Sequence, residues 1–133
     1  MAHVEIEMVP LFAEISEEAA KIVAGGGVAH VAAGQILAQA GDSGVGMFVV
    51  IEGSVLVERG ELHLEIGAGG FFGELALLNP ESPRIARVRA KTDSRILAIS
   101  RETFEFLLDT EPGFSRALLR ELAARLVAAR TGH

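Results

Sequence analysis

The 133-residue chain is acidic, with 18 acidic and 12 basic side chains, and half of its residues are hydrophobic. This composition excludes a disordered chain and argues against a nucleic-acid or anionic-membrane surface, because such surfaces need clustered Lys and Arg. The absence of cysteine excludes a disulfide framework and a Cys-based zinc site. No apolar run approaches the ~20 residues of a membrane helix and no signal-peptide layout is present. One cytoplasmic domain with a sizeable core, spanning residues 1–133, is therefore expected.

Residues 1–26 are predicted to form an N-terminal helical segment, in which an apolar stretch at residues 9–12 precedes the helix. Ser16 is a suitable N-cap, because its hydroxyl can accept a hydrogen bond from the first helical turn. Glu17 and Glu18 follow, where the helix dipole favours acidic side chains. Three consecutive glycines end the helix. Its buried stripe is expected at Ile15, Ala19, Ile22 and Val23.

Residues 27–99 are predicted to be all-β. Short apolar runs such as GMFVVIEG and SVLVERG alternate with glycine-rich turns, at the ~8–12-residue spacing typical of a sandwich or barrel. Val55 and Val57 are two residues apart, so in a strand their side chains point to the same face of the sheet. Val88 and Ala90 have the same spacing later in the chain. Mainly β with flanking helices is therefore the expected fold class.

Residues 100–133 are predicted to be helical. Ser100 can cap one helix that runs to about Leu108, and Pro112 can start a second. The second helix carries apolar residues at the spacing of a single helical face, namely Leu119, Leu122, Leu126 and Ala129.

Several catalytic patterns are rejected. GDSG at residues 41–44 resembles the nucleophile motif of trypsin-like proteases, but the next residue is Val45 and the chain is too short for their double barrel. The same stretch lacks the Lys-Ser or Lys-Thr of a phosphate loop. The four histidines share no ligand spacing, so no metal site is predicted. An enzyme is therefore the least favoured class of function.

The stretch FFGELALLNPESPRIARVRA, residues 71–90, holds one carboxylate in an apolar run, followed by an arginine ten residues later. GELALL can form a short helix from Gly73, whose free N–H groups can bind an anion. Arg84 would add a fork of donors for phosphate oxygens, and ionised Glu74 would accept from a sugar hydroxyl. These residues describe a phosphorylated sugar ligand. An ion pair between Glu74 and Arg84 across the turn explains them equally well.

The chain resembles the cyclic nucleotide-binding domain family over nearly its whole length. GDSGVGMFVVIEGSVLV is similar to the family's strand–turn–strand motif, and FGELALL followed by PRIARVRA is similar to its phosphate-binding cassette. The resemblance implies an antiparallel, jelly-roll-like β-roll with an N-terminal helix, a short cassette helix and two C-terminal helices. It also implies a regulatory module that binds cyclic AMP, with cyclic GMP as the second candidate ligand and no further cofactor.

The resemblance assigns a role to each residue of the cassette. Glu74 would accept from the ribose 2′-hydroxyl, and Arg84 would pair with the cyclic phosphate. The N–H groups of Leu75 and Ala76 would line the phosphate. Ala86 would keep its strand close to the ligand.

Ile85 and Arg87 depart from the family's pattern, which has Ala, Ser or Thr directly after the arginine and often Thr at the second position. Ile85 offers no hydroxyl to a guanine amino group, which disfavours cyclic GMP, and its bulk would crowd the pocket. Strand alternation can point Arg87 outward. A degenerate domain that serves as an interaction scaffold without nucleotide is therefore the alternative function.

Arg125 lies on the last helix, which in this family closes over the base as a lid. Its guanidinium would stack on the purine. Pairing with Glu121, one helical turn earlier, is the alternative and the preferred interpretation. Closure of the lid is expected to signal to an effector domain or protein, with no contact to nucleic acid and no insertion into a membrane. The oligomeric state and the effector stay open.

Overall fold

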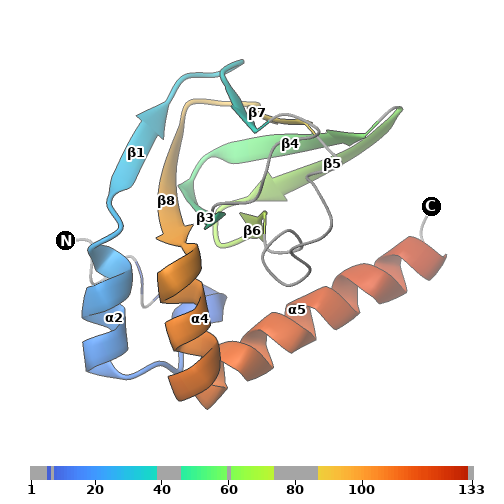
Figure 1. Ribbon diagram of the computed structural model, residues 1–133. Coiled ribbons are helices and arrows are strands. Elements are labelled where there is room, and N and C mark those ends of the chain that lie inside the picture. The colour runs from blue at the N-terminus through green and yellow to red at the C-terminus, as the bar shows by residue number, and fades with distance from the viewer. Residues whose placement is uncertain (1–5, 7, 39–45, 60, 74–86, 132–133) are drawn as a thin grey trace.

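The computed structural model describes residues 6, 8–38, 46–59, 61–73 and 87–131. Within these residues, eight strands form two four-stranded antiparallel sheets that face each other as a roll (Figure 1). The first sheet has the order β1-β8-β3-β6 and the second has the order β2-β7-β4-β5. The strands are β1 (Val28–Val31), β2 (Ile36–Ala38), β3 (Gly46–Glu52), β4 (Ser54–Arg59), β5 (Leu62–Gly67), β6 (Phe71–Phe72), β7 (Arg87–Ala90) and β8 (Ser94–Ser100). The expected fold class is confirmed.

Two hydrophobic clusters lie on opposite faces of the first sheet. One cluster lies between the sheets and includes Val50, Val55 and Val88. The other joins the outer face of the first sheet to the helices and includes Met47, Val49 and Leu97 from the strands. The helices that cover this face are η1 (Pro10–Phe12), α2 (Glu17–Ala24), α4 (Arg101–Thr110) and α5 (Pro112–Thr131).

The local signals for α2 are confirmed, with one correction to its buried face. The Ser16 hydroxyl accepts a hydrogen bond from the N–H of Ala19 at 3.1 Å, as an N-cap does. Ala19 and Val23 are buried as expected, but the third buried side chain is Ala20. Ile22 is 45% exposed, so its placement in the core was wrong. The buried side of α2 carries the small alanines, and Ile22 lies at the edge of that side, where it is partly exposed.

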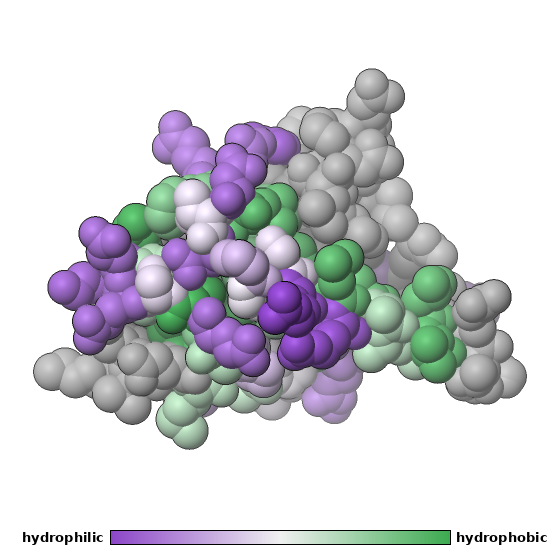
Figure 2. Space-filling model, turned by 90° about the horizontal axis from the view of Figure 1, so that it is seen from below, coloured by the Kyte–Doolittle hydropathy of each residue, from purple (hydrophilic) through white to green (hydrophobic). Residues whose placement is uncertain are grey.

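The C-terminal helices begin where the sequence predicts. The Ser100 hydroxyl accepts from the N–H of Thr103 at 3.1 Å, and α5 starts at Pro112. Phe114 anchors the start of α5, because its ring stacks on Phe12 at 6.1 Å and meets Phe104 edge-on at 5.9 Å. Beyond Leu118 the helix exposes apolar side chains, and Figure 2 shows this hydrophobic surface towards its C-terminal end. These side chains are Leu119, Leu126 and Val127, each more than half exposed.

Candidate functional site

The structure describes two of the predicted binding residues, Gly73 and Arg125, together with β6 and β7, the strands at the two ends of the predicted cassette, residues 71–90. The other six lie outside the described residues, as does the helix expected to start at Gly73, so their roles stay predictions. These six are Glu74, Leu75, Ala76, Arg84, Ile85 and Ala86.

The chain enters the cassette through β6, a two-residue strand that the sequence did not predict. Phe71 and Phe72 pair with Val49 and Phe48 of β3. Phe71 packs in the helix-side cluster and Phe72 packs in the cluster between the sheets, and both rings are buried. Gly73 follows with a φ of 93°, a conformation that glycine adopts without the penalty of a side chain. The glycine is therefore required by the backbone at the start of the cassette.

Arg125 connects α5 to this entry strand. Its Nη2 donates a hydrogen bond of 2.7 Å to the carbonyl oxygen of Phe71. Its Cζ lies over the Phe71 ring, 4.4 Å from the centroid. The ion pair expected with Glu121 is present, with Nε and Oε2 3.6 Å apart. The contact with Phe71 was missed by the sequence analysis, because no local pattern marks a partner 54 residues away.

The cassette ends in β7, and Arg87 on this strand hydrogen-bonds to the neighbouring strand β4. Arg87 lies on the exposed side of β7, as strand alternation predicted, while Val88 and Ala90 are buried. It donates two hydrogen bonds to Oε1 of Glu58 on β4, at 2.9 and 3.1 Å. Arg89 donates to Oε2 of the same carboxylate at 3.0 Å. The Glu58 carboxylate thus links β7 to β4 at the C-terminal end of the cassette.

The two arginines make the Glu58 carboxyl more acidic. The hydrogen bond from Arg87 lowers the pKa of the Glu58 carboxyl below its ordinary value of 4.5, and Arg89 adds to this effect against the opposing effect of burial. Nearby on the same sheet, a hydrogen bond of 2.9 Å from Lys91 lowers the pKa of Glu65. Both acids therefore remain ionised at neutral pH and keep their basic partners in place.

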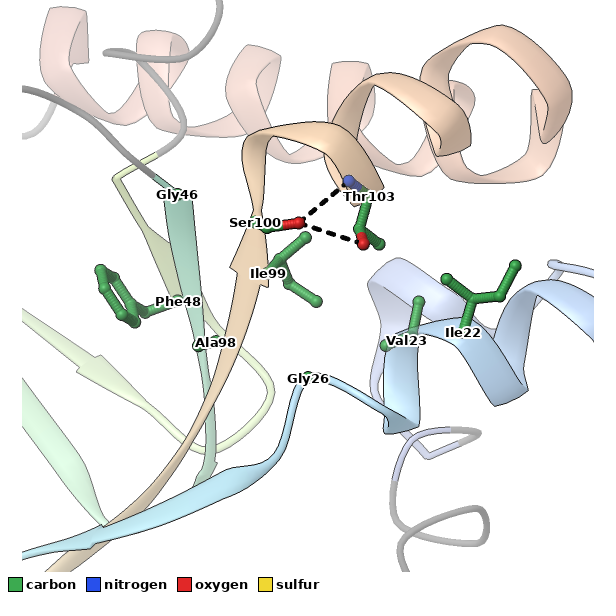
Figure 3. Close-up of a pocket in the computed structure, with 9 residues that line it drawn as sticks. All are labelled: Ile22, Val23, Gly26, Gly46, Phe48, Ala98, Ile99, Ser100 and Thr103. Carbon is green, nitrogen blue, oxygen red and sulfur yellow. Dashed lines mark hydrogen bonds between the residues drawn. The ribbon is translucent and has the colours of Figure 1, made fainter.

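A separate cavity of about 250 Å³ lies between α2, β3, β8 and the start of α4 (Figure 3). Its described lining is mostly apolar, and its hydroxyls, from Ser100 and Thr103, already hydrogen-bond to each other. None of the described lining residues carries a charge, so this cavity does not suit a phosphate. The lining residues are Ile22, Val23, Gly26, Gly46, Phe48, Ala98, Ile99, Ser100 and Thr103.

The described part of the chain shows no group of three or more acidic, histidine or cysteine side chains placed to hold a metal ion. None of its helices has the length and hydrophobicity needed to cross a membrane.

The family is decided by comparison with known proteins. The model of the cyclic nucleotide-binding domain matches residues 28–111, which include the whole predicted cassette, residues 71–90. The chain belongs to this family. A cyclic nucleotide-gated potassium channel of Rhizobium etli is 32% identical over 121 residues, which are 90% of this chain and 34% of the channel. The chain thus spans about a third of the length of this curated relative.

Two solved structures of the family share the fold and differ in the nucleotide with which they are associated. The regulatory domain of Toxoplasma gondii PKA, crystallised with cyclic AMP, is 26% identical with a TM-score of 0.76, over 94% of this chain and 49% of that one. A structure from a cyclic-GMP-dependent signalling pathway that regulates bacterial phytopathogenesis is 34% identical with a TM-score of 0.70. The matched region covers 85% of this chain and 94% of the chain in that structure. Family membership therefore establishes a cyclic nucleotide-binding domain without choosing between the two nucleotides.

Proposed function

We propose that this domain binds cyclic AMP in preference to cyclic GMP and acts as a cytoplasmic regulatory module within residues 1–133. The observation that carries the proposal is the family match across residues 28–111, because it includes a cassette that retains Glu74 and Arg84. Glu74 accepts from the ribose and Arg84 pairs with the phosphate. The preference for adenine depends on Ile85, which leaves the guanine amino group without a hydroxyl partner.

The proposed signal is a change in the position of α5. Phe114 and Leu118 hold the start of this helix in the core, whereas its later apolar side chains are exposed and have surface left to bury. The ligand favours the arrangement in which the later part of α5 covers the base. It shifts the population only by its difference in affinity for the two arrangements. An effector domain or partner protein reads the position of the helix.

Calorimetry with three nucleotides tests the proposal. Cyclic AMP is expected to bind more tightly than cyclic GMP, and 5′-AMP is expected to bind far more weakly because it lacks the cyclic phosphate. A preference for cyclic GMP contradicts the assigned role of Ile85. Failure of both cyclic nucleotides to bind a folded protein contradicts the proposal and favours the degenerate domain instead.

A further inference from the structure

We propose that α5 of one copy of this chain lies on the exposed surface of α2 and α4 of a second copy, and that the two copies exchange this contact in a two-fold dimer. The inference goes beyond the proposed function and does not depend on the nucleotide. It rests on two surfaces of opposite charge, which the described part of the chain leaves exposed.

The outer face of α5 carries apolar and basic side chains together. Phe114 and Leu118 mark the face that packs in the core. The residues on the opposite side of the helix, at 3.6 residues per turn, are all exposed. They are Arg116, Leu119, Arg120, Ala123 and Leu126. Over residues 112–128, α5 has three arginines and one glutamate, a net charge of +2. Arg116 and Arg120 make no ion pair with a described residue, so both charges are available to a partner.

The surface that α2 and α4 present to solvent is acidic. The two helices together carry five acidic and two basic side chains, a net charge of −3 out of −6 for the whole chain. Glu18 of α2 and Asp109 of α4 are exposed, and neither has an ion-pair partner among the residues that the structure describes. The charge of this surface therefore complements that of α5.

Two apolar side chains lie on the same surface as these acids. Ile22 of α2 and Thr103 of α4 line one cavity, so the two helices face each other there (Figure 3). Phe106 follows Thr103 by about one helical turn and lies on the same side of α4. Ile22 is 45% exposed and Phe106 is 36% exposed. They give the leucines of a docked α5 an apolar surface to cover.

A second copy fits this surface better than the same chain does. In Figure 1, α5 runs away from α2, so the C-terminal half of the helix lies beyond the α2–α4 surface of its own chain. Two α5 helices paired in parallel would bring Arg116 and Arg120 of both copies together, and like charges across an interface are unfavourable. Docking on α2 and α4 brings the same arginines to acidic side chains instead.

The two surfaces lie toward opposite ends of one face of the molecule. Figure 2 shows hydrophilic surface on the side of α2 and hydrophobic surface toward the C-terminal end of α5. A two-fold axis in the plane of contact, perpendicular to the line that joins the two surfaces, brings each surface of one copy onto the other surface of its partner. Both contacts are then made twice, and the assembly closes at two copies.

Charge reversal on each surface tests the dimer, by sedimentation velocity of the full chain over a concentration series without added nucleotide. Arg116→Glu combined with Arg120→Glu is expected to raise the dissociation constant about tenfold or more, because like charges then face each other. Glu18→Lys combined with Asp109→Lys is expected to do the same. An equimolar mixture of the two double variants is expected to recover the wild-type affinity, because each reversed surface again meets the opposite charge. Glu61→Lys is the control, since Glu61 is exposed on the turn between β4 and β5, and it is expected to leave the affinity unchanged.

Other arrangements give different results. A wild-type chain that stays monomeric over the whole series overturns the inference and leaves the proposed nucleotide binding untouched. Unchanged dimerisation of the Glu18→Lys and Asp109→Lys variant overturns it in favour of pairing through α5 alone, and a mixture that stays monomeric overturns the exchange of contacts. Where circular dichroism shows that a variant does not fold, the salt dependence of the wild-type dimer decides. Its dissociation constant is expected to rise with sodium chloride, which screens exposed charges, and a dimer insensitive to salt contradicts the inference.

Discussion

Glu111, at the junction of α4 and α5, accepts two hydrogen bonds from Ser16, the residue that caps α2. The Ser16 N–H lies 2.8 Å from Oε1 and the Ser16 hydroxyl lies 3.0 Å from Oε2. Close by, a side chain on Gly113 would meet the carbonyl oxygen of Glu14 at 2.5 Å, so the backbones approach closely. The N-terminal segment and the start of α5 are therefore joined as one unit.

Replacing Ser16 with alanine is expected to lower the free energy of unfolding by about 1–2 kcal/mol, because the helix loses its cap and Glu111 loses a hydrogen bond. Urea denaturation measures the change. Ser100→Ala is the matched control, since Ser100 also caps a helix but the described hydrogen bonds of its hydroxyl are to Thr103 and not to a carboxylate. An equal loss in the two variants would show that Glu111 adds no stability.

The hydrogen bonds from Arg87 and Arg89 to Glu58 predict that replacing Glu58 changes the stability of the protein in a pH-dependent way. Because folding lowers the pKa of Glu58, its contribution is fully present above the ordinary value of about 4.5 and is lost as pH falls through the folded pKa. Glu58→Gln is therefore expected to be less stable than wild type at pH 7 and to approach it in acid. Thermal unfolding from pH 7 to pH 3 measures this difference, with the exposed Glu61→Gln as control. A gap that stays constant with pH contradicts the assignment.

Arg84→Ala is expected to weaken cyclic AMP binding at least tenfold while the fold is retained, since a hydrogen bond to a charged group contributes about 1.5–3 kcal/mol. Arg87→Ala is the control, because Arg87 lies three residues later and its described partner is Glu58. Calorimetry is expected to show a much smaller change for the control. Unchanged affinity in Arg84→Ala removes this arginine from the site.

The lid is tested by truncation after Leu122. Cutting directly after Pro112 would remove Phe114 and Leu118, which are buried, so any loss of binding would reflect a damaged core. Truncation after Leu122 keeps both residues and removes Arg125. Faster dissociation of cyclic AMP is expected, and in the full chain hydrogen exchange at residues 119–126 is expected to slow when ligand binds. Unaltered dissociation together with unaltered exchange would exclude α5 as a lid.

Local signals allowed much of the fold to be predicted. Ser16, Ser100 and Pro112 mark helix starts through chemistry confined to one helical turn, and alternation placed Arg87 outward because a strand has a period of two. The placement of Ile22 failed because helical periodicity defines a stripe but not which edge of it is buried in the core. The contact between Arg125 and Phe71 spans 54 residues, and such pairs depend on how whole elements dock. For the site itself, motif resemblance supplied the cassette roles, and those remain predictions.

The two strands that flank the cassette differ in how firmly they are held. β7 is an interior strand, hydrogen-bonded to β2 on one side and β4 on the other. Arg87 and Arg89 on this strand also hydrogen-bond to Glu58 of β4. β6 is two residues long and, among the described strands, lies at the edge of its sheet with β3 as its neighbour. Among the described strands, β6 therefore has fewer backbone hydrogen bonds to hold it in place than β7 has. β6 is also the strand that Arg125 contacts from α5, so a ligand that displaces β6 is expected to alter this contact first.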